Sequence, residues 1–181
     1  MLAFIKERRS HFLKEFNGKK APDSIIQEML EASIWAPSHR LTLPFRYEVF
    51  PPNQLGYLSS AIESSYRKKG VDVDPLKIEK IQSFSDKLSH AIAIIFKPSG
   101  KVPEWEEYAS LGAAVQNMYL QLSSLQKFGG YWTTGNEINS VIMREFIQLE
   151  DSEVHCGYFF IGGIDNKRTK AARPAVDVNW R

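Results

Sequence analysis

The sequence predicts an α+β fold, in which helices and strands follow one another in mixed order. Three segments support this fold class. Residues 104–127 carry an apolar pattern typical of a long helix, residues 91–96 form a continuous apolar run, and residues 45–50 alternate as a strand does. The 181 residues suit one domain. We expect a single domain over residues 1–181, with residues 165–181 as an extended arm.

The composition favours a packed protein without a nucleic-acid or membrane role. Hydrophobic residues make up 43% of the chain and charged residues 24%, and the net charge is +2. A balance this even does not favour nucleic acid or an anionic membrane surface, and the longest apolar run is far shorter than the ~20 residues of a membrane span. One cysteine, Cys156, excludes an internal disulfide. With no signal-peptide pattern at the N-terminus, we expect a cytoplasmic location.

The first predicted helix covers residues 23–35. Asp23 or Ser24 can cap its first turn, and Pro37 disfavours helical geometry at the residue before it. A loop then leads to the predicted strand at residues 45–50, which is rich in strand-forming residues and is followed by two prolines.

Between the two predicted strands the pattern is weaker. Residues 54–69 look helical, and a polar stretch without clear periodicity runs on to residue 87. Residues 91–96 are then apolar at every position, which indicates a strand buried on both faces.

Residues 104–127 form the clearest predicted helix. Apolar side chains recur at alternating spacings of three and four, and a patch of small residues allows another helix to approach closely. Gly129 and Gly130 are expected to end the helix. The helix is either a central core helix or one that also packs against its copy in a second chain, and the two interpretations are compatible. The apolar stripe comprises Tyr108, Leu111, Val115, Met118, Leu122 and Leu125.

Three shorter elements follow the central helix. We expect a short strand or turn at residues 131–134, a helix at residues 138–149 and a strand at residues 155–162. The polar tail at residues 165–181 has no periodicity, so it should be mobile unless another surface holds it.

The sequence contains no recognisable self-sufficient active site. The four histidines do not stand at metal-ligand spacing, and no glycine-rich phosphate loop or nucleophile elbow occurs. Cys156 is interpreted as a small buried apolar residue rather than a nucleophile. We therefore expect no metal site and no catalytic side chain, so that an organic cofactor would carry the chemistry.

Several segments, taken in order, resemble the motifs of the nitroreductase family of flavoenzymes. Each motif is common by chance, but the ordered set covers nearly the whole chain. The resemblance implies a three-layer α/β/α sandwich around a central, mainly antiparallel sheet, with a long central helix and a C-terminal arm exchanged with the partner. The matching segments are residues 7–10, 36–39, 44–49, 102–106, 112–117, 128–135 and 157–162, followed by Lys167 and Arg168.

The resemblance implies that FMN binds with its phosphate at the N-terminal Arg-Arg-Ser box. Arg8 can form a bidentate clamp and Ser10 can donate a hydroxyl hydrogen bond. Lys167 or Arg168 can approach the same phosphate from the end of the last strand. Without the resemblance, Arg8 and Arg9 are equally well interpreted as a solvated helix end. Lys167 and Arg168 are then better interpreted as a solvated turn.

The flavin ring would lie between several segments, some of them from a second chain. His39 would be a proton donor or a nicotinamide contact, although it is equally well interpreted as a residue that orders the loop or faces solvent. The implied ring-binding residues are Arg9, the loop residues Pro37, Ser38, His39 and Arg40 reaching over from the partner, and Trp132, Thr133 and Thr134.

The loop before the first strand departs from the family pattern. Family members usually carry a glutamine that bonds to the flavin ring where this chain has Leu43, and a tryptophan where it has Phe45. Leu43 is still expected to lie at the flavin, but its side chain cannot make that bond. One lost hydrogen bond is worth only ~1 kcal/mol, so FMN binding should survive if the phosphate clamp is intact.

The function that the resemblance implies is an FMN-dependent oxidoreductase that works by a ping-pong mechanism. A homodimer would hold FMN at the subunit interface and pass hydride from NAD(P)H, as NADH or NADPH, to a small acceptor such as a nitroaromatic or a quinone. A second enzyme hypothesis keeps the fold but changes the reaction, as in relatives that fragment flavin or remove a halogen from their substrate. A non-enzymatic alternative is a flavin-binding or flavin-free dimeric protein with the same fold.

Overall fold

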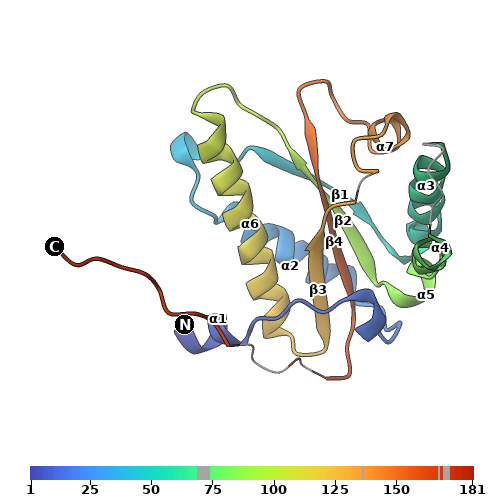
Figure 1. Cartoon of the computed structure of the whole chain (residues 1–181), viewed down its shortest axis with the longest axis horizontal. Coiled ribbons are helices and arrows are strands. Elements are labelled where there is room, and N and C mark those ends of the chain that lie inside the picture. Colours follow the sequence, from blue (N-terminus) through green and yellow to red (C-terminus); the bar gives the residue numbers. More distant parts are fainter. Residues whose placement is uncertain (69–73, 136, 167, 169–171) are drawn as a thin grey trace.

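The computed structural model describes residues 1–68, 74–135, 137–166, 168 and 172–181. A four-stranded sheet with the order β1-β2-β4-β3 lies at its centre, and all three strand pairings are antiparallel (Figure 1). The strands are β1 (Phe45–Phe50), β2 (His90–Phe96), β3 (Phe128–Thr133) and β4 (Val154–Gly163).

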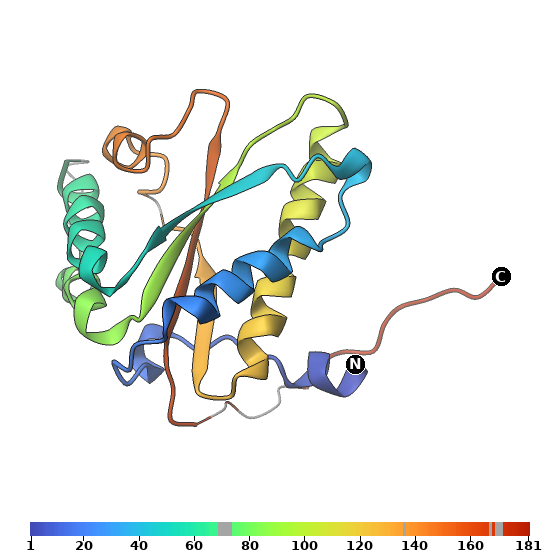
Figure 2. The ribbon, with the colours of Figure 1, turned by 180° about the vertical axis from the view of Figure 1, so that it is seen from behind.

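Helices cover both faces of the sheet, so the expected three-layer sandwich is confirmed (Figures 1 and 2). The long helix α6 and the shorter α2 pack against each other on one face, and four helices lie on the other. Their bounds are α2 (Asp23–Ile34) and α6 (Glu104–Ser124) on one face, and α3 (Leu55–Lys68), α4 (Pro75–Gln82), α5 (Phe84–Lys87) and α7 (Val141–Phe146) on the other.

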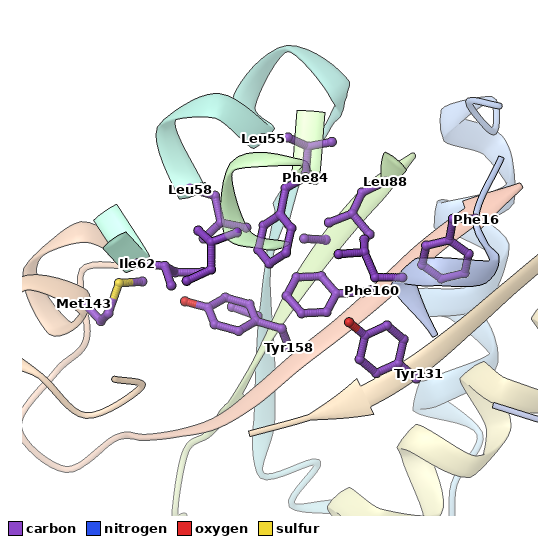
Figure 3. Close-up of a cluster of buried hydrophobic side chains, with 14 of the residues drawn as sticks. Phe16, Leu55, Leu58, Ile62, Phe84, Leu88, Tyr131, Met143, Tyr158 and Phe160 are labelled. Carbon is purple, nitrogen blue, oxygen red and sulfur yellow. The ribbon is translucent and has the colours of Figure 1, made fainter. Parts of the chain in front are cut away.

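The sheet separates two apolar clusters. One lies beneath α3, α5 and α7 and is rich in aromatic side chains (Figure 3). The other lies between the sheet and the pair α2 and α6. Strand β2 is buried at every position and contributes to both clusters, as its continuous apolar sequence predicts.

The predicted capping of α2 is wrong. Pro22 stands at the N-cap and no side chain caps the helix. The carboxylate of Asp23 instead lies 3.0 Å from Nε2 of His90, on the neighbouring strand β2. A long-range contact to a buried histidine therefore takes the place of the local cap.

The predicted end of α6 is also wrong. The helix ends at Ser124, and Gly129 and Gly130 belong to β3. A Cβ atom on Gly130 would lie 2.7 Å from the carbonyl oxygen of Phe160, so this glycine allows the two strands to pack closely. The helix expected over residues 138–149 is shortened to α7.

The weakly patterned stretch before β2 forms two helices rather than an irregular segment. Asp74 caps α4, since its carboxylate accepts a hydrogen bond of 3.0 Å from the backbone N–H of Leu76, and Pro75 occupies the first helical turn. These local signals start the helix although its apolar face is short.

Short elements and an extended tail complete the chain. The N-terminal helix α1 (Leu2–Glu7) is followed by three 3₁₀ turns: η1 (Leu13–Glu15), η2 (His39–Leu41) and η3 (Pro52–Gln54). Residues 172–181 are exposed throughout and run away from the rest of the chain (Figures 1 and 2). Among the helices described, none has the length and apolar character needed to cross a membrane.

Candidate functional site

Tyr119, on α6, joins the N-terminal segment to strand β3. Its hydroxyl accepts a hydrogen bond of 2.6 Å from the backbone N–H of Trp132 and lies 3.4 Å from Oγ of Ser10. The guanidinium of Arg8 lies over the Tyr119 ring, 4.8 Å from its centre. The structure thus brings together three of the predicted site residues around a tyrosine that the sequence reasoning missed.

Arg168 reaches the same region from beyond the last strand. Its Nη1 donates to the carbonyl oxygen of Ser10 at 3.2 Å, and its backbone N–H donates to Nε2 of His11 at 3.4 Å. Its Nε also lies 3.3 Å from the carboxylate of Glu15. Arg168 therefore contacts the Arg-Arg-Ser box through the backbone of Ser10. Lys167 lies outside the described residues.

The charges at this end of the molecule fit an anion. Among the described residues, Arg8 has no carboxylate within ion-pair distance, and its guanidinium lies over the Tyr119 ring. Arg8 contacts Tyr119, whose hydroxyl lies near Ser10, and Arg168 contacts the Ser10 carbonyl oxygen and the Glu15 carboxylate. We call Arg8, Ser10 and Arg168 the arginine cluster. A phosphate monoester suits this donor set, because guanidinium groups bind phosphate oxygens in a bidentate manner.

Arg9 has a structural role in the same segment. Its Nη1 donates to the carbonyl oxygens of Lys6 and Arg8, at 2.8 and 2.7 Å. It also lines a cavity of about 90 Å³, together with His11 and Tyr119. The side chain therefore fixes the turn after α1 while facing the cavity beside α6.

A second group of predicted site residues lies in the loop before β1. The hydroxyl of Ser38 accepts a hydrogen bond of 3.1 Å from the backbone N–H of Leu43, which closes the loop on itself. Nδ1 of His39 lies 2.5 Å from a carboxylate oxygen of Glu106, and Nη1 of Arg40 donates to the carbonyl oxygen of Lys101 at 3.4 Å. The loop, which includes Pro37, is thereby tied to the start of α6.

This loop stores backbone strain. Arg40, Leu41 and Leu43 have φ angles of 53°, 52° and 42°, in the left-handed region that side chains with a Cβ rarely adopt. Strain of this kind persists only where the surroundings impose it, and it concentrates at functional sites. The strained geometry supports a functional role for the loop.

One chain does not bring the two groups together. The loop contacts α6 at Glu106 and the arginine cluster contacts it at Tyr119, a separation of about 20 Å along the helix axis. Figure 1 shows η2 beside the first turn of α6, and α1 close to its other end. Within one chain, the two groups therefore lie near opposite ends of α6.

The predicted site residues at the end of β3 lie on two sides of the sheet. Trp132 lies on the α6 side, where its indole N–H donates to the carbonyl oxygen of Cys156 at 2.8 Å. Thr133 and Thr134 line a cavity on the opposite, α3 side. The three residues hence do not form one continuous surface within the chain.

The remaining candidate chemistry is limited. Cys156 is half-buried rather than fully buried, and burial raises the pKa of its thiol, which disfavours the thiolate. Within the described ranges, no group of three histidine, cysteine, aspartate or glutamate side chains is placed to hold a metal ion. The arginine cluster and the strained loop are therefore the best candidates for function.

Comparison with known proteins identifies the family. A model described as the nitroreductase family matches residues 5–163. "Putative NAD(P)H nitroreductase YdjA" of Escherichia coli K12 is 26% identical over 138 residues, which cover 76% of this chain and 74% of the relative.

Solved structures share the fold. A nitroreductase-like family protein from Bacillus cereus has a TM-score of 0.77 at 23% identity, over 96% of this chain and 90% of the other. A structure from Desulfovibrio desulfuricans, described as a nitroreductase in complex with FMN, has a TM-score of 0.73 at 21% identity, over 99% and 97% of the two chains. With the family model matching most of its length, this chain belongs to the nitroreductase family.

Proposed function

We propose that this protein is an FMN-dependent oxidoreductase that transfers reducing equivalents from NAD(P)H to a small acceptor such as a nitroaromatic or a quinone. The observation that carries the proposal is the convergence of Arg8, Ser10 and Arg168 beside Tyr119. Family membership and the FMN named for a solved relative support this choice of ligand. The donor set fits the phosphate of FMN, as argued above.

Each residue of the cluster has a distinct task in this proposal. Arg8 and Arg168 bind the phosphate oxygens, and the Ser10 hydroxyl donates to the same group. Tyr119 holds Ser10 and Trp132 in register, since it contacts both. When bound, FMN supplies the hydride chemistry, and the protein supplies position and charge. No side chain of the cluster needs to transfer a proton.

We further propose that the functional unit is a homodimer. The loop with His39 lies about 20 Å along α6 from the arginine cluster, so one chain provides the phosphate end and a second chain the loop. Trp35 lies just before this loop in the sequence, and Trp105 is next to Glu106, which contacts the loop. Their side chains are 78% and 72% exposed, as is typical of residues that a partner covers. The arm over residues 165–181, which is exposed from residue 172 onward, would then lie on the partner as well.

The first test is spectroscopic. The purified protein is reconstituted with FMN, its visible spectrum is recorded, and NADH or NADPH is added without oxygen. Retained flavin absorption that bleaches on addition supports the proposal, and addition of a nitroaromatic or a quinone should restore it. A colourless protein that does not take up FMN contradicts the proposal.

The second test separates phosphate binding from general stability. Arg8→Ala should weaken FMN binding at least tenfold, because a charge-assisted phosphate contact is lost. Arg67→Ala is the matched control, since Arg67 is exposed on α3 and pairs with Glu63 four residues earlier. Equal FMN affinity of the two variants would refute the phosphate clamp.

The alternative is a dimer that keeps the fold without flavin chemistry. Leu43 favours it, since an apolar side chain occupies the position from which family members bond to the flavin ring. The two functions differ in the first test: the alternative gives a dimer by light scattering with no reduction by NAD(P)H.

A further inference from the structure

A groove of about 500 Å³ lies between the N-terminal segment and the helices α4 and α5. Residues 12–14 form one wall, and side chains of α4, α5 and the residue between them form the other. Figures 1 and 2 show η1, which contains two of these residues, beside α5. The volume falls within the range of roughly 300–1,000 Å³ that is typical of small-molecule sites. None of the lining residues belongs to the arginine cluster or is expected at the flavin ring.

The groove has an apolar part that is open to solvent. Leu76, in the first turn of α4, is 71% exposed, and Phe12 on the opposite wall is 42% exposed. The centre of the Phe12 ring lies 5.2 Å from that of the Tyr131 ring and 5.1 Å from the guanidinium of Arg168, so packing holds the ring in place. Single exposed apolar residues are common, but two that line one groove from opposite walls indicate a surface for an apolar group.

The charged groups of the groove favour an anion. Three lysines, Lys14, Lys80 and Lys87, line it, against a single carboxylate, that of Glu79. Among the described residues, no carboxylate lies within ion-pair distance of any of the three ammonium groups. Nζ of Lys87 donates a hydrogen bond of 3.4 Å to the carbonyl oxygen of Phe16, so its position is partly fixed. Lys14 and Lys80 are exposed and come from opposite walls.

We propose that this groove binds a small molecule with an apolar body and one carboxylate group, such as an aromatic carboxylic acid. The body would lie against Phe12, Leu13 and Leu76, and burial of its surface would supply part of the affinity. The carboxylate would accept hydrogen bonds from Lys14 and Lys80 and so lower the repulsion between the two walls.

Other classes of ligand use only part of this groove. A cation would meet three ammonium groups and one carboxylate. An inorganic anion would leave the apolar surfaces in water, and an uncharged apolar molecule would leave the ammonium groups without a partner. The site goes beyond the proposed oxidoreductase function and does not depend on it, because its residues differ from those proposed to bind FMN.

Matched probes test the proposal on the purified full-length protein by calorimetry, with and without excess FMN. 2-Naphthoate is compared with 2-naphthamide, which keeps the ring but not the charge, and with acetate, which keeps the charge but not the ring. 2-Naphthoate should saturate one site per chain with a Kd of about 1 mM or tighter, at least tenfold below the Kd of either partner. Excess FMN should change this Kd less than about twofold.

Three results would overturn the proposal. The first is equal affinity of 2-naphthoate and 2-naphthamide, because the lysines would then make no contribution. The second is displacement of 2-naphthoate by FMN, because the probe would then occupy the flavin site. The third is the absence of saturable binding, which is expected if a second copy of the chain covers the groove.

Variants at exposed positions assign the contacts. Lys14→Gln combined with Lys80→Gln should weaken 2-naphthoate binding at least tenfold and leave the weaker binding of 2-naphthamide unchanged. Leu76→Ser should weaken both probes, and 2-naphthoate at least threefold, because both lose the same apolar contact. Each of these side chains is exposed, so the variants should keep the Tm of the parent within about 2 °C.

Lys101→Gln is the matched control for the loss of charge, since Lys101 is exposed and lies outside the groove. This variant should bind 2-naphthoate as the parent does. If the double lysine variant keeps its Tm and also binds 2-naphthoate as the parent does, the site is refuted.

Discussion

Nδ1 of His39 lies 2.5 Å from a carboxylate oxygen of Glu106 and ties a strained loop to the first turn of α6. The side chain of His39 is 53% exposed and that of Glu106 is 25% exposed. Arg40 makes a second tie, to the carbonyl oxygen of Lys101 just before the same helix. Two polar contacts thus hold a segment whose backbone conformation is itself unfavourable.

The coupling between His39 and Glu106 should be small but measurable. A double-mutant cycle with His39→Ala and Glu106→Ala should give about 0.5 kcal/mol by urea unfolding, because solvent screens a half-exposed pair, and 1 M salt should reduce it. Glu104→Ala in place of the Glu106 change is the control, since Glu104 lies in the same turn without a recorded contact to His39. Equal coupling in the two cycles would show that the pair does not hold the loop.

Relief of loop strain should stabilise the protein. Leu41 has a φ of 52° and is 80% exposed, so Leu41→Gly removes the left-handed penalty of about 1 kcal/mol with little loss of packing. We expect a gain of about 0.5 kcal/mol after the added flexibility of the unfolded chain is counted. Leu76→Gly, at an exposed position in helix α4, should instead lose about 0.5–1 kcal/mol. A loss of stability in the Leu41 variant would show that its side chain makes important contacts.

Restoring the usual glutamine should strengthen flavin binding if the proposed function holds. Leu43→Gln adds one hydrogen bond to the ring, worth about 1 kcal/mol, so the Kd for FMN should fall about fivefold. Fluorescence titration of the flavin measures this. Leu43→Met, which keeps the apolar character, is the control. An unchanged Kd for the glutamine variant would mean that the loop does not reach the ring.

Local patterns predicted the parts of the fold whose causes are local. Strand β1 starts and ends where predicted, because an alternating segment is bounded by prolines, and β2 follows from its continuous apolar run. The role of Gly129 and Gly130 was predicted wrongly, because a glycine pair after a helix suggests a helix cap. In the structure both glycines lie in β3, and Gly130 allows this strand to pass close to Phe160. Long-range contacts leave no local pattern.

In the candidate site too, local motifs were predicted from the sequence, whereas long-range contacts were not. The Arg-Arg-Ser box and the loop with His39 were identified by resemblance to family motifs. Tyr119 was missed, because its contacts with Ser10 and Trp132 join segments far apart in sequence. Tyr119 directly follows Met118 of the apolar stripe, so the sequence places it at the edge of the buried face of the helix. That position was the one signal that could have identified it.

Protonation of Glu153 should contribute to acid unfolding. Its carboxylate accepts hydrogen bonds of 2.8 and 2.7 Å from Arg46, which holds the pKa of Glu153 below its usual range. The pair therefore stabilises the protein above the unfolded pKa of about 4, and this contribution is lost as pH falls through the lower folded pKa. Glu153→Gln should cost about 3 kcal/mol at pH 7 and less near pH 3.

Urea unfolding of the parent and the variant at several pH values measures the Glu153 effect. Glu48→Gln removes the other, more exposed carboxylate that contacts Arg46, and should cost under about 1 kcal/mol. A cost for Glu153→Gln that is small, or that does not shrink at low pH, would contradict the interpretation.

His155 should destabilise the protein as pH falls from 7 to 5, a higher pH range than the one in which Glu153 acts. It is 1% exposed, its Nδ1 lies 3.1 Å from the carbonyl oxygen of Ile138, and burial lowers its pKa to about 4. Below the unfolded pKa of about 6.5 the unfolded chain binds a proton that the native state excludes, so stability falls as pH drops toward 4. The loss due to this residue between pH 7 and pH 5 should be about 2 kcal/mol. In His155→Phe the loss should be smaller by that amount, whereas His39→Ala, at an exposed histidine, should keep it. If His155→Phe loses as much stability as the parent between pH 7 and pH 5, another group causes the acid sensitivity and the prediction is wrong.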